Sequence, residues 1–450
     1  MRFDRMALTM SHLCVFVLKN VPAAAFKVPN VTASLQICNQ QYFAIASHST
    51  SLRSLMIKKM NRKKIKVVAV AEALGLLDPP KVQRRYWVHP LNMDREKIGQ
   101  FRTFFENIRQ YPDKFFEYYR MSISSFDELL KTLRPHITKS TTEFRNPISA
   151  EERLTITIRY LSTGTCFSAL KFDFCVGRST IGVIVKDTCK VIWLTLNSKE
   201  MPKPTTEDWV EISNIFYTKT NFPNCLGAID GKHIRCKNPN DSGSLYFNYK
   251  KYFSIVFMAV VDANLNFVVI DVGSYGREGD SNVFKECAFG KQLYEDKLNI
   301  PEPVVLPNTS ANPQPYVFIG DEAFALHKNL LRPYPGRKLT DSRRVFNYRL
   351  SRARRTVECA FGVLANKWRV LHTAIQVEPD FTDDIIKACC ILHNFVRKRD
   401  GINYEDSQTH NFEDIEARGT GTRSDGVEVR DYFANYFMGP GAVDFQYDMI

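Results

Sequence analysis

The chain has 450 residues, a formal net charge of +13 and a hydrophobic fraction of 44%. That length exceeds the usual size of one hydrophobic core, so we expect two domains with additional terminal segments. The hydrophobic fraction excludes an intrinsically disordered chain, and no apolar run is long enough for a membrane span, so no membrane partner is expected. The basic excess favours a polyanionic partner such as DNA.

The charge is unevenly distributed. Residues 398–450 are expected to form an acidic C-terminal tail, because residues 401–450 carry ten acids against three arginines. Residues 1–85 are expected to be a variable and disordered N-terminal region. They include a basic cluster at 58–66, which suits a nuclear import signal or a nucleic-acid contact, although a solvated charged stretch is an equal alternative. An apolar leader at 6–18 resembles a weak secretory signal and leaves an extracellular hydrolase as a rival hypothesis.

The eleven cysteines are scattered and form no Cys-x-x-Cys pair, which is typical of buried thiols in a reducing compartment. Cys389 and Cys390, with His393, have the spacing of metal ligands. They lie in the apolar run 385–395, however, so a core helix is the better interpretation.

Residues 86–206 are predicted to form a helical domain. A capping box at Ser149 opens a helix over 151–162, a short helix follows at 167–174, and Ser179 is expected to cap a third helix that ends at Trp193. Gly177 lies in the turn between the second and third helices. This spacing predicts a helix-turn-helix, whose third helix would offer Arg178 and Lys186 to DNA. Simple packing of three helices is an equally open alternative.

After a linker at 197–206, residues 220–397 show a mixed pattern of strands and helices. Strands are predicted at 225–229, 252–261, 267–272 and 316–319, and helices at 280–292 and 349–368. The second of these helices has a buried stripe of five residues, namely Ala353, Val357, Phe361, Leu364 and Trp368. The fold class is therefore α/β (α+β), with a mixed sheet preceded by an all-helical domain.

Acidic residues stand at matching positions of this second domain. Asp230 and Asp321 each follow a short apolar strand beside a glycine, and Glu358 lies on the helix over 349–368. If the two strands are parallel neighbours, both aspartates emerge at one sheet edge. Asp280 begins the helix over 280–292 and is either a further ligand or only its N-cap. Clustered carboxylates are what a pair of Mg²⁺ or Mn²⁺ ions requires for phosphoryl transfer.

Five blocks carry a likeness to a known family. They are Gly227–His233, Gly279–Phe284, Gly320–Phe324, Arg332–Gly336 and Phe346–Glu358, and the likeness runs on through Trp368 to Leu392–Phe395. Together they resemble the nuclease domain of the PIF/Harbinger transposases and the nucleases derived from them, in the DDE superfamily. The resemblance implies a ribonuclease H-like fold. This sequence departs from the common pattern in a longer loop before Asp280.

Carried over by resemblance, Asp230, Asp321 and Glu358 are catalytic, and the same three residues with Asp280 hold Mg²⁺ or Mn²⁺. The implied reaction is hydrolysis of DNA phosphodiester bonds by a two-metal mechanism, and a catalytically silent DNA-binding or scaffold protein is the alternative. Arg349, Arg352 and Arg355 flank Glu358 and are expected to contact the DNA backbone. His233 either contacts DNA or the metal-bound water, or is a hydrogen-bonded structural residue. The resemblance further implies a nuclear or also cytoplasmic location and a Myb-like DNA-binding partner. A homo-oligomer is an open alternative.

Overall fold

A computed structural model describes residues 85–141, 146–401 and 424–449. Residues 88–450 form one compact unit, to which the following description applies. The basic cluster at 58–66 and the apolar leader at 6–18 lie outside the described residues. Within the described ranges, no helix is both long and apolar enough to cross a lipid bilayer.

The first half of this unit is helical, as the sequence predicts. Its helices are α5 (Pro90–Met93), α6 (Arg95–Ile98), α7 (Gln100–Ile108), α8 (Pro112–Tyr119), α9 (Ile123–Ile137), α10 (Ala150–Thr163), α11 (Phe167–Asp173), α12 (Arg178–Glu200) and α13 (Thr206–Thr220). Aromatic rings join α7, α8 and α9, since Phe126 of α9 lies 5.9 Å from Phe105 of α7 and 5.6 Å from Phe115 of α8, centroid to centroid. Such contacts add to the burial of apolar surface that holds short helices together.

The helix-turn-helix spacing is present, but its caps differ from the prediction. Ser149 caps α10 by accepting a hydrogen bond from the Glu152 amide at 3.2 Å, as expected. The prediction that Ser179 caps α12 is wrong, because the helix begins at Arg178 and Gly177, in extended backbone, takes the N-cap position. α12 also continues to Glu200, so the predicted linker begins four residues too early. Its apolar side packs against α17 (Pro379–Asp400).

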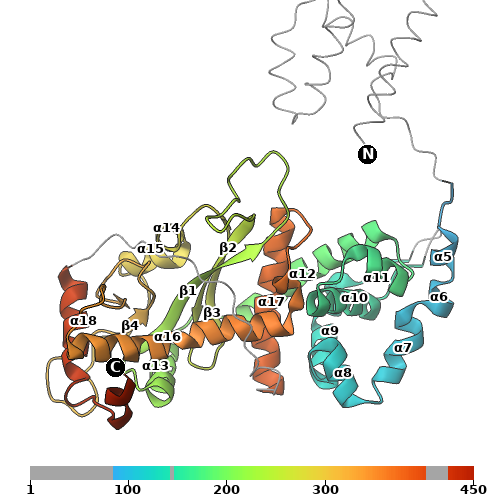
Figure 1. Cartoon of the computed structure of the whole chain (residues 1–450). Helices are drawn as coiled ribbons and strands as arrows, with labels where there is room; N and C mark the ends of the chain where they lie inside the picture. The colour runs from blue at the N-terminus through green and yellow to red at the C-terminus, as the bar shows by residue number, and fades with distance from the viewer. Residues whose placement is uncertain (1–84, 142–145, 402–423, 450) are drawn as a thin grey trace, which may run out of the picture. The chain divides into compact units, whose positions relative to one another are not determined.

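The second half is built on a five-stranded mixed sheet (Figure 1). The strands are β1 (Cys225–Arg235), β2 (Ser254–Val261), β3 (Phe267–Tyr275), β4 (Val317–Ile319) and β5 (Leu330–Leu331), in the spatial order β3-β2-β1-β4-β5. β1, β2 and β3 form an antiparallel meander, whereas β4 runs parallel to both β1 and β5. This mixed α/β sheet is the one expected for a ribonuclease H-like domain.

The remaining helices cover the sheet. They are α14 (Asp280–Glu286), α15 (Ala288–Tyr294), α16 (Asp341–Lys367), the 3-10 turns at Arg369–His372 and Asp444–Met449, α17, and α18 (Ser424–Tyr436). The single helix predicted over 280–292 is two helices, because Cys287 adopts extended backbone between them. α16 begins eight residues before the predicted start at Arg349. Part of the acidic tail also packs on the sheet domain, since α18 contacts α16 and buries Phe433 and Phe437 near it.

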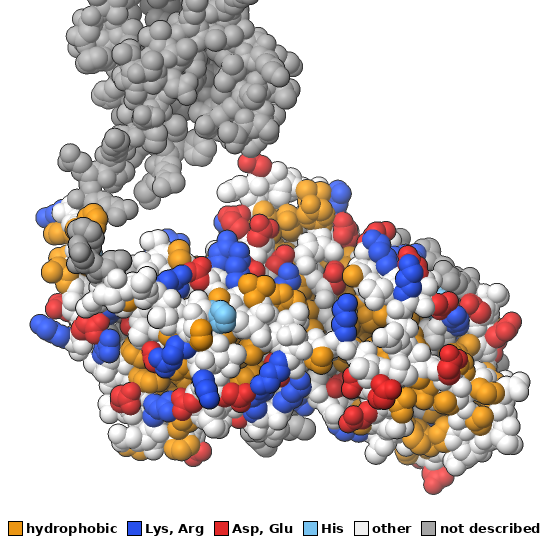
Figure 2. Space-filling view, turned by 180° about the vertical axis from the view of Figure 1, so that it is seen from behind, with side chains coloured by type: hydrophobic (Ala, Val, Ile, Leu, Met, Phe, Trp, Pro, Cys, Tyr) orange, Lys and Arg blue, Asp and Glu red, His pale blue; other side chains and the backbone are white. Residues whose placement is uncertain are grey.

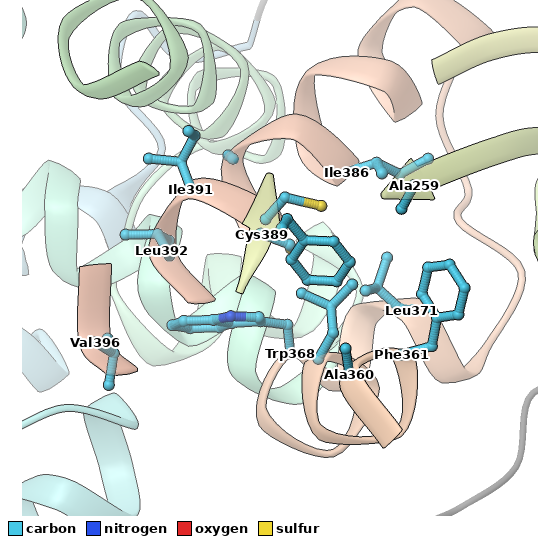
Figure 3. Packing of buried hydrophobic residues seen from close by; sticks show 14 of the residues in the cluster. Ala259, Ala360, Phe361, Trp368, Leu371, Ile386, Cys389, Ile391, Leu392 and Val396 are labelled. Carbon is cyan, nitrogen blue, oxygen red and sulfur yellow. The ribbon is translucent and has the colours of Figure 1, made fainter. Parts of the chain in front are cut away.

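The core between α16, α17 and the sheet confirms the predicted stripe of α16. All five stripe residues are buried, and Figure 3 shows Trp368, directly after this helix, beside Leu392 and Cys389 of α17, while Phe361 lies near Leu371. His393 is fully buried and its Nε2 lies 2.8 Å from the Leu265 carbonyl oxygen. The interpretation of this segment as a core helix is thereby confirmed over a metal-binding one.

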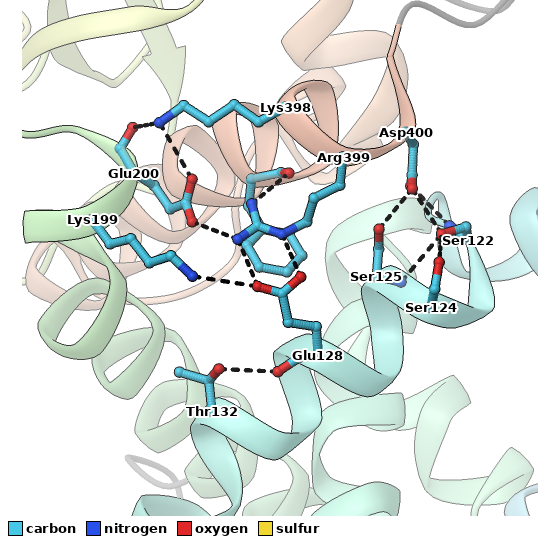
Figure 4. Close-up of polar contacts among 11 residues, drawn as sticks. Ser122, Ser124, Ser125, Glu128, Thr132, Lys199, Glu200, Lys398, Arg399 and Asp400 are labelled. Atoms are coloured by element: carbon cyan, nitrogen blue, oxygen red, sulfur yellow. Dashed lines mark hydrogen bonds and ion pairs between the residues drawn. The ribbon is translucent and has the colours of Figure 1, made fainter.

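An ionic network ties the helical half to α17 (Figure 4). Arg399 of α17 donates to both carboxylate oxygens of Glu128 in α9, each at 2.7 Å, and to Glu200 at the end of α12 at 3.0 Å. The neighbouring Asp400 accepts hydrogen bonds from Ser122 and Ser125 at the start of α9. Charge-assisted and bidentate bonds of this kind fix orientation as well as adding stability. α17 therefore belongs to both halves of the unit.

Candidate metal centre

Asp230 and Asp321 lie at the same level of two parallel strands. β1 pairs with β4 through Ala228 and Ile319, and each aspartate comes two residues after its member of that pair. The prediction that the first strand ends before Asp230 is wrong, since β1 continues to Arg235 along β2. β4 stops at Ile319, so among the described residues no strand pairs with the β4 side of β1 between Asp230 and Ile234. The carboxylates therefore meet at an open edge inside the sheet.

Asp280 completes a cluster with these two residues. Asp230, Asp280 and Asp321 each offer a carboxylate oxygen, and the three oxygens lie within 4.8 Å of one another. Asp280 is 2% exposed and occupies the first position of α14, while Gly279 is the N-cap and no side chain caps this helix. Neither Asp280 oxygen has a hydrogen-bond partner among the described residues. The alternative that Asp280 is the helix cap is therefore excluded by the geometry.

The space for Asp280 exists because residue 231 is glycine. A Cβ added to Gly231 would lie 2.7 Å from Asp280 Cγ, which is closer than real Cβ contacts. Glycine lets a ligand group approach the strand backbone. The Gly231 that follows Asp230 is thus part of the site, and the group that approaches its backbone is the Asp280 carboxylate.

Buried carboxylates at this separation repel one another. Burial raises the pKa of Asp280 well above its usual range, and the charges of Asp230 and Asp321 raise it further. Burial and the charge of Asp230 likewise raise the pKa of Asp321 to about 6, although the Ala323 amide donates to Asp321 Oδ1 at 2.8 Å. One cation offsets this repulsion in part, because Lys232 Nζ lies 3.2 Å from Asp230 Oδ2 and is also buried. Lys232 is not among the site residues predicted from the sequence.

These residues fit a divalent cation. Oxygen ligands in a group this small are what Mg²⁺ and Mn²⁺ prefer, and a bound cation would remove the repulsion that raises the aspartate pKa values. The carboxylate oxygens of Asp280, buried without a partner, are the donors that such an ion would satisfy. If protein groups already donated hydrogen bonds to both Asp280 oxygens, these oxygens would not need a metal ion as a partner.

Glu358 lies outside this group of three. Its carboxylate is 34% exposed and forms an ion pair with Arg354 one helical turn away, at 2.5 Å. The Arg354 charge in turn acts on Asp321 and lowers its pKa, against the larger effect of burial. Glu358 is therefore adjacent to the cluster through Arg354, and its place as a metal ligand remains a prediction.

The three arginines expected to contact DNA lie in different surroundings. Arg349 is 1% exposed, and its guanidinium donates to the Asn221 and Gly441 carbonyl oxygens and to Gln446 Oε1. The expectation that Arg349 contacts DNA is corrected, because a buried guanidinium with these partners cannot reach a phosphate. Arg355 is exposed, and Arg352 is half-buried against the Phe445 ring.

The helix-turn-helix candidates also differ from each other. Arg178 is exposed at the start of α12. Lys186 is half-buried, and its Nζ lies 5.7 Å from the Phe381 ring centroid. Its positive charge lowers the pKa of Asp384 in α17, against the larger effect of burial, which raises that pKa. Figure 2 shows basic and acidic side chains intermixed on one face of the molecule, so the net positive charge forms no uniform basic surface there.

His233 lies three residues beyond Asp230 in β1. Its Nδ1 is 3.0 Å from Ser254 Oγ, which also accepts from the Asn248 side chain at 3.0 Å. Burial and the charge of Lys250 lower the His233 pKa to about 4, so the imidazole is neutral near pH 7. A defined hydrogen-bond network through Ser254 and Asn248 holds the His233 imidazole in place.

Comparison with known proteins gives one family match and several relatives. Residues 229–394 match the model of the DDE superfamily endonucleases. The chain is 28% identical to "Protein ALP1-like" of Arabidopsis thaliana over 303 residues, which cover 63% of this chain and 71% of that protein. It is 26% identical over 182 residues to "Putative nuclease HARBI1" of Rattus norvegicus, covering 40% of this chain and 48% of the relative. No solved structure matches the chain.

Proposed function

Residues 229–394 belong to the DDE superfamily endonucleases, and on that premise we propose that this chain hydrolyses DNA phosphodiester bonds with divalent metal ions. The resemblance to Harbinger-derived nucleases is confirmed by the relatives named above. The convergence of Asp230, Asp280 and Asp321 within 4.8 Å is the observation that supports this function most directly.

In this proposal the three aspartates hold Mg²⁺ or Mn²⁺, with Glu358 as a further ligand beside them. Bound ions would polarise the phosphodiester and favour deprotonation of an attacking water. The chain's own residues position the substrate and set the charge of the site. Lys232 orients and neutralises Asp230, Arg354 lies between Asp321 and Glu358, and Gly231 leaves room for the Asp280 carboxylate.

DNA contacts outside the cluster are assigned to four exposed or half-buried cations, namely Arg178, Lys186, Arg352 and Arg355. Arg178 stands at the exposed start of the helix that a helix-turn-helix places in the major groove. Action on DNA also requires entry to the nucleus, and a Myb-like partner and self-association belong to the same proposal. Finding a tagged chain in the secretory pathway would contradict it and favour the extracellular alternative.

The test is nicking of supercoiled plasmid DNA in Mg²⁺ or Mn²⁺ compared with EDTA. The wild type is expected to nick only with metal, and Asp230→Asn, Asp280→Asn and Asp321→Asn are expected to lose that activity. Glu286→Gln is a matched control, since Glu286 lies on α14 but is exposed and paired with Lys291. Equal nicking by wild type and the three variants would reject the assignment.

A silent DNA-binding or scaffold protein is the second candidate. The ion pair between Glu358 and Arg354 favours it, because a carboxylate engaged in this way is not presented to the three aspartates. The same assay separates the candidates. Wild-type chain that binds DNA but nicks it in neither metal would support the silent protein.

A further inference from the structure

The segment between β1 and β2 carries an unusual density of aromatic side chains. Residues 246–253 contain five of them, and two are exposed: Phe247 by 40% and Tyr249 by 46%. Tyr275 at the end of β3 is 38% exposed and packs against Tyr246 at 5.1 Å between ring centroids. Figure 1 shows this segment projecting beyond the sheet. Neighbouring exposed rings of this kind indicate a binding surface.

Basic groups are interleaved with these rings. Residues 235–253 contain four lysines and arginines against a single acid, Asp241. Lys250 Nζ lies 5.6 Å from the Tyr249 ring centroid, and Arg235 Cζ lies 4.4 Å from that of Tyr252. Arg277, which follows Tyr275, is also exposed. A surface that combines aromatic faces with positive charge suits a ligand that is both flat-ringed and anionic.

The surface is held in place before any ligand binds. Phe247 and Phe253 form an antiparallel bridge with their rings 5.2 Å apart. The Asn248 side chain, which is buried, donates to Ser254 Oγ and accepts from the Tyr252 amide at 3.2 Å. Ordering these rings in advance removes part of the entropy cost of binding.

The same surface is attached to two of the three chain segments that supply the acidic cluster. Tyr249 packs on His233 at 5.9 Å between ring centroids, and His233 lies three residues beyond Asp230. The second segment is reached through Arg277, which lies three residues before Asp280. The Arg277 amide donates a hydrogen bond to the Leu245 carbonyl oxygen at 3.3 Å. Three residues of strand span about 10 Å, so Tyr249 is attached to β1 within a few residues of the acidic cluster.

We propose that Phe247, Tyr249 and Tyr275 stack on unpaired DNA bases beside the phosphodiester held at the acidic cluster, with Lys250, Lys251 and Arg277 contacting the adjoining phosphates. This inference rests on the proposed nuclease function. It adds that the DNA substrate has unpaired bases at the cleavage site, either in a locally opened duplex or in a single-stranded tail. Base faces are accessible to protein rings only where the bases are unpaired. A fully paired duplex would use the lysines and arginine and leave the rings in water.

The experiment measures binding by fluorescence anisotropy in EDTA, so that no cleavage contributes. The probes are a labelled DNA hairpin with a short unpaired 3′ tail and the same hairpin fully paired. The wild type is expected to prefer the tailed probe, and Phe247→Ala and Tyr249→Ala each to weaken binding of that probe at least about fivefold. Tyr249→Phe keeps the ring and is expected to bind like wild type. Tyr111→Ala is the matched control, since Tyr111 is 61% exposed in the helical half.

A second measurement needs no variant. A 2-aminopurine base in the unpaired tail is expected to lose fluorescence when the wild-type chain binds, because stacking on a ring quenches it. Equal affinity of wild type and Tyr249→Ala for the tailed probe, or unchanged 2-aminopurine emission on binding, would overturn the stacking surface. Either result leaves the plasmid assay untouched, and a failure of nicking in metal leaves these EDTA measurements untouched. The two proposals therefore fail separately.

Discussion

The carboxylate of Asp280 lies directly against the backbone of Gly231, on the strand that also carries Asp230. The contact leaves no room for a side chain at position 231, since an added Cβ would meet Asp280 Cγ at 2.7 Å. It also explains how a residue at the start of α14 reaches a site built on β1 and β4. A methyl group at this position is therefore expected to displace the Asp280 carboxylate from the acidic cluster.

Gly231→Ala is expected to push the Asp280 carboxylate out of the cluster and to weaken Mn²⁺ binding by about ten- to a hundredfold, as loss of a supporting contact at a metal site does. Isothermal titration with Mn²⁺ measures this. Gly279→Ala is the control, because Gly279 precedes the same helix but has open space around its α-carbon. Unchanged Mn²⁺ affinity in Gly231→Ala would show that the close contact has no bearing on the ions.

Metal removal is expected to lower the stability of the wild type more than that of Asp280→Asn. Three buried carboxylates repel one another without a cation, and replacing one of them by an amide relieves that repulsion. At a metal concentration 100-fold above Kd, binding contributes about 2.7 kcal/mol to the free energy of unfolding. Thermal unfolding in EDTA and in Mn²⁺ gives the comparison. Equal shifts of Tm in the two proteins would remove Asp280 from the ligand set.

Acidification is expected to stabilise the metal-free protein. Asp321 has a pKa raised to about 6, above the value of an exposed aspartate, so the folded state binds more protons than the unfolded state between these two values. The free energy of unfolding therefore increases as the pH falls from 7 through 6, until acid effects elsewhere dominate. Asp321→Asn is expected to flatten this part of the curve. Metal affinity is expected to fall over the same pH range, because protons compete for the carboxylates.

Arg349→Ala is expected to lower the free energy of unfolding by about 3 kcal/mol, because it leaves buried acceptors without their charged donor. The guanidinium joins α16 to Gly441 and Gln446 and lies 4.3 Å from the Phe437 ring centroid. Arg355→Ala, on the exposed side of the same helix, is expected to change stability by less than about 0.5 kcal/mol. Urea unfolding measures both. A larger loss of stability in Arg355→Ala than in Arg349→Ala would contradict the structural role of Arg349.

The level alignment of Asp230 and Asp321 could be predicted from sequence. Each residue comes after an apolar segment and next to a glycine, and this local pattern can be read from the sequence. If the two strands are parallel neighbours, the pattern puts both aspartates at one edge of the sheet. The buried stripe of α16 was predictable for the same reason, since a helical period is a local property. Strand length was not. β1 continues past Asp230 because β2 pairs with it as far as Arg235. That pairing joins residues that are distant in sequence, so the local pattern around Asp230 does not reveal where the strand ends.

The roles of Asp280 and Arg349 could not be read from local pattern. Asp280 has the sequence environment of an N-cap, and only its position over Gly231 shows that the carboxylate turns away from its own helix. Arg349 has the environment of a surface arginine, and its burial depends on residues more than 90 positions away in the acidic tail. Lys232 was overlooked because a lysine after a glycine is ordinarily solvated. For Asp280 and Arg349 the deciding contact is distant along the chain.

The parallel pairing of β1 with β4 has a consequence for how the protein matures. The strands that bring Asp230 and Asp321 together are separated by the whole of β2, β3, α14 and α15, and parallel pairing across such a span forms late and slowly. No shorter folding unit contains all three aspartates. A nascent or partly folded chain in which β4 has not yet paired with β1 therefore lacks the assembled cluster of three aspartates.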